Sequence, residues 1–281
     1  MDTETKKTEN RIRFESIAVL ADDKINLDEA ALVIAAEFQM DIDIEISLQT
    51  LSTLARDFET SFNPTAGLGV SVAGLIDFIH SNKGFCGNVK DYFNPQNSFL
   101  NRVLETRSGI PISLALVHIS LGQRLGIPVN GINFPNHFLV RYGDKPDQFI
   151  VDPLTGRILS EADCATLLKQ TAGPKAFIRP HYFDIADNKD ILVRILDNLK
   201  TIFWRKKSWN DSKACIENQI LLRPDHEKFS VQLGAVYEMQ GNIHLAQVTY
   251  RKFLQESENE HLRNLASNRL LAMHGSSPTI H

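Results

Sequence analysis

The chain has 281 residues, 43% of them hydrophobic, which is typical of a globular protein long enough for two domains. The 30 basic and 34 acidic residues give a formal net charge of -4, so nothing indicates a nucleic-acid partner. The basic run at 205–207 is typical of a solvent-facing helix. The longest apolar run, residues 30–36, is too short to span a bilayer, so no membrane partner is expected.

The three cysteines lie far apart, with no spacing typical of a zinc site or a disulfide framework: Cys86, Cys164 and Cys215. This pattern fits a reducing compartment, and the charged N-terminal segment has no signal-like apolar run, so we expect a cytoplasmic protein. The nine histidines form no metal-binding motif. We therefore expect no metal and no other cofactor.

The N-terminal third is predicted to be helical apart from its first residues. Residues 1–15 are charged and are expected to be disordered. Apolar residues at helical spacing predict helices over 27–37, with Asp28 as cap, 46–58 and 70–80. A glycine-rich loop then surrounds Cys86. This cysteine is either a small buried thiol in a tight turn or an accessible nucleophile.

The stretch 107–153 organises the chain. Residues 111–125 are apolar nearly all round and predict a buried helix, with Pro111 in its first turn, Ser108 or Gly109 as N-cap, and Gly126 as its left-handed stop. Three runs rich in β-branched and aromatic residues follow, at 129–134, 137–142 and 148–153. They predict strands, and the last two form an antiparallel hairpin.

The hairpin would bring two chemically capable residues together. A turn centred on 144–145 places His137 directly opposite Asp152, with their Cβ atoms roughly 5 Å apart on one face. A register shift of one residue would put the two side chains on opposite faces.

The C-terminal half predicts helices. Ser160 and Asp163 have the spacing of a capping box at the start of a helix. Residues 173–190 are rich in Gly, Pro and polar residues and read as a domain linker. Beyond them, small and aromatic residues recur with a period of about 34 residues, which resembles tetratricopeptide repeats. Residues 260–273 would be the capping helix, and 275–281 a tail.

A buried helix beside a histidine-bearing strand, with an aspartate on the next strand, is the layout of transglutaminase-like and papain-like cysteine hydrolases. In that layout the nucleophile lies about fifteen residues before a Gly-Ile-Pro, and here this position is Pro111, which has no nucleophile. Ser113 lies two residues further on, a rotation of about 200° around the helix, and cannot replace it. Cys86 is the remaining candidate nucleophile.

One long run of motifs resembles the bacterial SirB family: 84–88 (Gly-Phe-x-Gly-Asn), 91–92, 97–100, 103–104, 107–111 (Arg-x-Gly-Ile-Pro), 134–141 and 151–153. The resemblance implies an α+β fold, with a transglutaminase-like (papain-like cysteine-hydrolase) core and a helical N-terminal part over 16–172. An all-α tetratricopeptide-type repeat over 191–274 follows. It also implies a bacterial cytoplasmic protein whose ancestral catalytic cysteine is replaced by proline, as at Pro111.

Three hypotheses about function follow. In the first, an inactive transglutaminase-like domain binds a protein or peptide partner in its cleft, aided by the helical repeats. In the second, a cysteine hydrolase or acyltransferase uses Cys86, His137 and Asp152 as nucleophile, base and orienting carboxylate. In the third, His137 and Asp152 form only a structural hydrogen bond. Further residues expected to line the cleft are Asn88, Tyr92, Arg107, Pro111 and Ser113.

Overall fold

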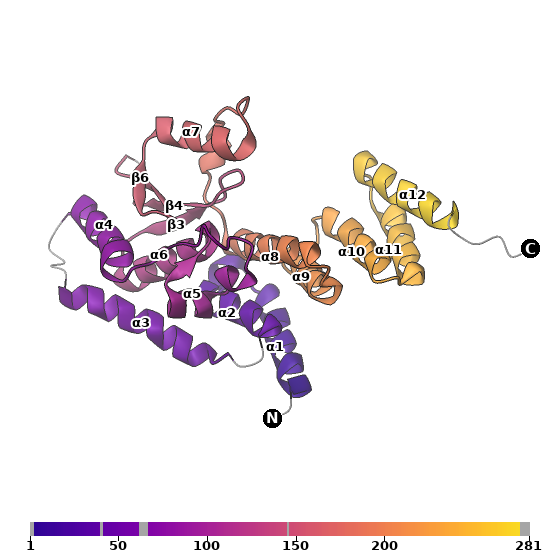
Figure 1. Cartoon of the computed structure of the whole chain (residues 1–281), viewed down its shortest axis with the longest axis horizontal. Coiled ribbons are helices and arrows are strands. Elements are labelled where there is room, and N and C mark those ends of the chain that lie inside the picture. Colours follow the sequence, from indigo (N-terminus) through magenta and orange to yellow (C-terminus); the bar gives the residue numbers. More distant parts are fainter. Residues whose placement is uncertain (1–2, 40–41, 62–66, 145, 276–281) are drawn as a thin grey trace, which may run out of the picture. The chain divides into compact units, whose positions relative to one another are not determined.

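The computed structural model describes residues 3–39, 42–61, 67–144 and 146–275 (Figure 1). The chain divides into two compact units, Met1–Ile195 and Leu196–His281. Each unit is described by itself. None of the helices in these residues is both long and apolar enough to cross a membrane.

The N-terminal segment forms a helix, which corrects the prediction of disorder over 1–15 for the residues described. Helix α1 (Thr3–Ala18) packs on α2 (Leu27–Phe38), and its Phe14 and Ile17 are buried. Asn10 Nδ2 also donates to Ala36 O at 3.2 Å. The local sequence is polar, so the helix depends on tertiary packing that composition does not reveal.

The next helices lie close to their predicted positions: α3 (Ile44–Ser61) and α4 (Leu68–Asp77), which continues in a π-helical turn over Phe78–Asn82. A further short helix, α5 (Leu100–Thr106), follows. The cap of α2 differs from the prediction. Asn26 accepts from Glu29 N at 3.2 Å, whereas the Asp28 carboxylate is buried and binds Ser120 Oγ and Arg124 Nη1 at 2.9 and 2.6 Å. Asp28 therefore ties α2 to the central helix.

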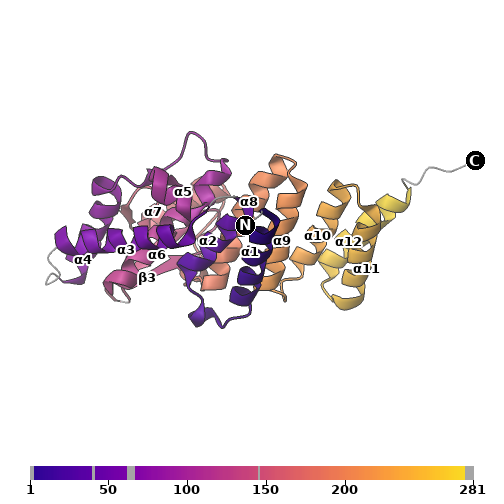
Figure 2. The same cartoon turned by 90° about the horizontal axis from the view of Figure 1, so that it is seen from below.

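That central helix, α6 (Pro111–Leu125), has the predicted bounds, and every residue from Pro111 to Gly122 is buried. Its N-cap is Ile110, not Ser108 or Gly109, and it stops at Gly126 with φ 67°. Helices α2, α3 and α5 pack against it on one side, and strands β3 and β4 on the other (Figures 1 and 2). This enclosure explains why its sequence is apolar nearly all round.

The main sheet is antiparallel, with strand order β3-β4-β5-β6: Val129–Ile132, Leu139–Tyr142, Phe149–Asp152 and Arg157–Leu159. Strands β3, β4 and β5 are shorter than the predicted strands, and β6 was not predicted. Val140 pairs with Val151, so the hairpin register is shifted by two residues from the predicted one, and Asp152 lies opposite residue 139. Because the shift is even, the side-chain faces are unchanged. Residue 145 of the turn lies outside the described residues.

The other face of the sheet is covered by α7 (Glu161–Ala172) and residues 176–183, as Figure 1 shows for α7. Ser160 and Asp163 form the predicted capping box. Residues 173–190 differ from the predicted linker: they contain a 3-10 helix (Pro180–Phe183), Phe183 packs near Phe134, and Ala186 N donates to Gly131 O at 2.9 Å. This polar segment thus packs on the sheet of the first unit.

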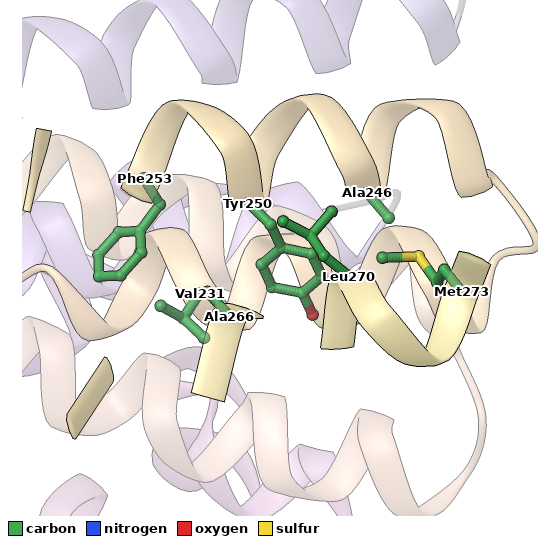
Figure 3. Close-up of a cluster of buried hydrophobic side chains, with 7 residues drawn as sticks. All are labelled: Val231, Ala246, Tyr250, Phe253, Ala266, Leu270 and Met273. Atoms are coloured by element: carbon green, nitrogen blue, oxygen red, sulfur yellow. The ribbon is translucent and has the colours of Figure 1, made fainter. Parts of the chain in front are cut away.

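The second unit contains the end of α8 (Asn188–Arg205) and four helices: α9 (Trp209–Leu222), α10 (Lys228–Met239), α11 (Ile243–Glu256) and α12 (Glu260–Gly275). From α9 onward, helices adjacent in sequence pack against each other. Figure 3 shows the cluster that joins the last three, centred on Tyr250. Gly234 permits this packing, because a Cβ there would lie 2.5 Å from the Tyr250 ring. The predicted tail beyond residue 275 lies outside the described residues.

Candidate functional site

His137 and Asp152 meet, as the sequence predicted. His137 Nε2 lies 2.9 Å from Asp152 Oδ1, and the His137 side chain is 9% exposed. His137 precedes β4, and Asp152 ends β5, so the pair sits at one end of the sheet. Among the described residues the Nδ1 atom of His137 has no recorded hydrogen-bond partner, which leaves this nitrogen available to a ligand or a reacting group.

The loop before β4 fixes the position of the imidazole. Asn136 adopts φ 55°, a left-handed conformation that asparagine tolerates, and His137 N donates to Phe134 O at 3.1 Å. Arg194 donates from Nη1 to Asn133 Oδ1 at 3.1 Å and from Nη2 to His137 O at 3.4 Å. The histidine is therefore held through its backbone on both sides.

The Asp152 carboxylate is held in its ionised form. Burial opposes its charge, but hydrogen bonds from His137, Leu154 N and Thr155 Oγ1 outweigh that cost and lower the pKa of Asp152 below its ordinary value. An ionised carboxylate on Nε2 favours the tautomer with a proton there and a lone pair on Nδ1. The pair could thus accept a proton at Nδ1.

The N-terminus of α6 carries no nucleophile. Pro111 occupies its first position and is buried. The Ser113 hydroxyl is also buried, donates to Asn97 O at 2.5 Å and accepts from Ile110 N at 3.1 Å. Ser113 therefore closes the first turn of α6.

Cys86 is exposed, and its neighbour Gly87 is hydrogen-bonded to Leu154, two residues after Asp152. It opens β1 (Cys86–Gly87), which pairs in parallel with β2 (Ser108–Gly109). Gly87 N donates to Leu154 O at 3.2 Å, and a Cβ at Gly87 would lie 2.5 Å from the Leu154 side chain. No hydrogen bond between the thiol and His137 is recorded among the described residues.

The other predicted cleft residues surround this loop. Asn88 Nδ2 donates to Asn97 Oδ1 at 3.0 Å, and Asn88 Oδ1 accepts from Asp91 N at 3.1 Å, so its amide shapes the loop. Tyr92 is 41% exposed, and partial burial raises its pKa while the charge of Arg194 opposes the rise.

Arg107 forms the other side of this loop. It adopts φ 58°, its guanidinium lies 4.7 Å from the Phe85 ring centre, and its Nη1 is buried without a partner. Burial lowers the pKa of Arg107, although not enough to neutralise a guanidinium.

A second polar cluster was missed by the sequence analysis. His118 on α6 is fully buried, its Nε2 lies 3.1 Å from His80 Nε2, and its Nδ1 lies 2.5 Å from Tyr142 Oη on β4. His80 sits in the π-helical turn and contacts Phe85 O through Nδ1 at 2.8 Å. The available signal was one histidine inside an otherwise apolar helix, since a buried polar group needs a partner.

The protons of this cluster have one consistent arrangement when both imidazoles are neutral. The Phe85 carbonyl can only accept, so His80 Nδ1 carries a proton and His80 Nε2 accepts one from His118 Nε2. His118 Nδ1 then accepts from Tyr142 Oη. Burial lowers the pKa of both histidines and raises that of Tyr142, which favours neutral groups throughout.

Comparison with known proteins agrees with this architecture. A family model described as the transglutaminase-like superfamily matches residues 46–197, which is more than half of the chain. The chain belongs to the transglutaminase-like superfamily. The match includes α6, the sheet, His137 and Asp152, and it runs through residues 173–190.

Similar proteins extend over most of the chain. A UPF0162 protein of Xylella fastidiosa is 28% identical over 246 residues, covering 86% of this chain and 88% of its own. Another, of Pseudomonas aeruginosa, is 37% identical over 183 residues, with coverages of 65% and 67%. Human F-box only protein 21 is 27% identical over 165 residues, or 54% of this transglutaminase-like chain and 25% of the human protein.

Among solved structures, the crystal structure of menin aligns with 87% of this chain and 68% of its own, at 12% identity and a TM-score of 0.41. This similarity is too low to support an argument about the fold.

Proposed function

We propose that this chain is a cytoplasmic transglutaminase-like protein of the SirB type that has lost catalysis and binds a peptide or protein partner beside His137 and Asp152. The observation that carries the proposal is the contrast between the intact His137–Asp152 pair, joined at 2.9 Å, and the proline at the position of the nucleophile. Without a thiolate at the helix N-terminus, the imidazole has no nucleophile to activate there.

A surface loop connected with the pair through Arg194 supports binding, because Arg194 donates to His137 O and its charge acts on Tyr92. The loop between β1 and α5 exposes Val89, Tyr92 and Phe93, at 77%, 41% and 47% of their surface. The Tyr92 and Phe93 rings pack edge to face, 5.3 Å apart. Exposed apolar side chains that gather in one loop are typical of interaction sites, and aromatic residues contribute much of the energy at such sites.

The second unit supplies a further docking surface in this proposal. The proposal takes its helices to be of the tetratricopeptide type, and the close approach of Gly234 to Tyr250 supports this, because such repeats have small residues at helix crossings. Repeats of this kind bind extended or helical segments of partner proteins.

Alkylation of Cys86 tests the loss of catalysis. We would measure the rate of iodoacetamide labelling from about pH 5 to 9 in the unaltered protein and in His137→Ala. Of the three cysteines, Cys86 is exposed and the others are buried, and burial raises the pKa of the Cys164 thiol to about 11. We expect the same rate and the same pH dependence in both proteins.

The opposite outcome would support the second candidate function, a cysteine hydrolase or acyltransferase. The exposure of Cys86 and the link from Gly87 through Leu154 to Asp152 favour testing it. Fast labelling near pH 6 that disappears in His137→Ala, together with turnover of a peptide amide that requires Cys86, would establish that function.

Peptide binding is tested separately. Peptides are selected from a random library against the full chain, and their affinity is measured by fluorescence anisotropy. The affinity should fall about tenfold in Tyr92→Ala and in Phe93→Ala. The matched control is Ile46→Ala on α3, which removes an apolar side chain that is 60% exposed and lies outside both proposed surfaces. Binding that is equal in all three variants, or a failure to select any peptide, would refute the proposal.

A further inference from the structure

A cavity of about 890 Å³ lies in the first unit, on the face of the sheet turned away from α6. Its walls come from β4, β5, β6, the start of α7 and residues 178–185. Most of the lining is apolar, including Ile150, Ile158, Leu159, Ile178 and Phe183. The volume lies in the range of small-molecule sites. The residues lining it do not include His137 or Asp152, so the cavity is distinct from the candidate site.

Two polar side chains in this apolar wall have atoms without partners. Arg141 Nε and Gln148 Oε1 are buried and make no hydrogen bond. No ion pair or other hydrogen bond of the Arg141 guanidinium is recorded among the described residues. The strand register explains their proximity, because Arg141 pairs with Ile150 and Gln148 lies two residues earlier on the same face. Both groups line the cavity.

A partly buried guanidinium without a counterion is costly unless a ligand neutralises it. Its planar fork matches a carboxylate, and the Gln148 amide can turn its NH₂ group to the same ligand, since its two ends are interchangeable by rotation. The Cys164 thiol in the wall stays protonated, because burial raises its pKa to about 11. The wall therefore offers one positive charge.

The other charged residues restrict the ligand further. Glu161 and Asp184 also line the cavity, and both are exposed at its rim. They disfavour a second negative charge on the ligand. A peptide would bring backbone amides that need partners, but the Ser160 hydroxyl in the wall is already engaged with Asp163. A ligand with a single polar head and an aliphatic body fits these groups best.

We propose that this cavity binds an aliphatic monocarboxylate, with its carboxylate on Arg141 and Gln148 and its chain along the apolar wall formed by β5, β6 and Ile178. Such a ligand would supply the counterion that Arg141 lacks and would cover exposed apolar surface such as Ile185, which lines the cavity and is 48% exposed. The proposal does not depend on the proposed partner site at His137.

Isothermal titration of the full chain with decanoate, decanol and decanedioate tests the inference. Decanoate should bind saturably. Decanol, which lacks the charge, should bind at least about tenfold more weakly, as expected for the loss of a hydrogen bond to a charged group. Decanedioate should also bind more weakly, because its second carboxylate meets Glu161 and Asp184.

Two variants complete the experiment. Arg141→Met, which keeps the apolar stem, should lower decanoate affinity to that of decanol, whereas Arg179→Met, at an exposed arginine of the adjoining segment, should leave it unchanged. In the unaltered protein, decanoate should also shift the NMR signal of the Arg141 Nε–H group, a readout independent of variant folding. Absence of saturable binding, equal affinity in both variants, or displacement of decanoate by a tighter-binding peptide C-terminus would overturn the proposal.

Discussion

At the scale of single residues, His118 makes the stability of the first unit depend on pH. Its imidazole is fully buried and neutral, with a pKa well below the ordinary value near 6.5, because burial and the neighbouring His80 both disfavour its charge. In the unfolded chain the same residue takes up a proton as the pH falls below about 6.5. The unfolded state then binds more protons, so stability is present above that pH and is lost below it.

We therefore expect the free energy of unfolding to fall by about 1.4 kcal/mol per pH unit for this histidine between about pH 6 and 5. Urea unfolding followed by circular dichroism at pH 7.5, 6 and 5 measures it. His118→Phe should be less stable at pH 7.5, because Tyr142 and His80 lose a partner. Its unfolding free energy should also depend less on pH, because its unfolded state takes up about one proton fewer. Equal slopes in both proteins would contradict the prediction.

Asp152 affects stability at lower pH than His118 does. Its pKa is lowered in the folded state, so its contribution is present above the unfolded value near 3.9 and is lost as the pH falls through the folded value. Asp152→Asn should cost about 1.5–3 kcal/mol at pH 7, the range for hydrogen bonds to a charged group, and progressively less as the pH falls through the folded pKa. The control is Asp144→Asn, an exposed carboxylate in the same hairpin. If Asp152→Asn is as stable as this control at pH 7, the His137–Asp152 bond is not a structural staple.

At the scale of elements, two helical glycines should respond in opposite directions to the same substitution. A Cβ at Gly122 of α6 would lie 2.2 Å from Val129 Cγ2, whereas one at Gly69 of α4 would lie 3.5 Å from the Phe149 ring. Gly122→Ala should destabilise by about 1–3 kcal/mol, because it overpacks the contact of α6 with β3. Gly69→Ala should stabilise by up to about 1 kcal/mol, through helix propensity alone. Thermal unfolding of the two variants beside the unaltered protein decides this.

Elements differ in how well their own residues predict them. The bounds of α6 could be read from Pro111, its apolar sequence and Gly126, because all three signals are local. The helix of residues 3–18 could not, because its stability depends on packing Phe14 and Ile17 against α2. The His137–Asp152 contact was predicted from a register that was wrong by two residues, and the contact still forms because an even error keeps both side chains on the same face.

Part of the site was beyond sequence reasoning. The His80–His118–Tyr142 cluster joins a π-helical turn, a helix and a strand, and no local pattern relates three residues so far apart. Lys200 is a second example. Its ammonium contacts Asp197, Gln219 and Gln232 at 2.6, 2.9 and 2.9 Å. Lys200 is thus held by polar partners on α9 and α10 as well as on its own helix.

At the scale of the whole molecule, each of the two units contains a buried cluster of its own, and we expect the units to unfold separately. Both tryptophans of the chain, Trp204 and Trp209, belong to the second unit, so their fluorescence reports on that unit. Phe253→Ala removes a buried ring from the cluster of Figure 3 and should cost about 3–5 kcal/mol. It should lower the fluorescence midpoint in urea.

The same variant should leave the first unit unaffected. Hydrogen exchange of α6 amides, measured by mass spectrometry, should be equal in Phe253→Ala and the unaltered protein. Gly122→Ala should show the reverse pattern, with faster exchange in α6 and an unchanged fluorescence midpoint. A shift of both readouts in both variants would show that the units unfold as one.

The peptide group between Phe85 and Cys86 is hydrogen-bonded through both its carbonyl and its N–H. His80 Nδ1 binds its carbonyl at 2.8 Å, and Arg107 O accepts its N–H at 2.9 Å. Because a peptide group is a rigid plane, it cannot turn without breaking both contacts. The exposed thiol of Cys86 is thus attached to an anchored plane, while the other two cysteines are buried. A spin label at Cys86 would therefore report the orientation of the first unit as a body, with little contribution from motion of the loop.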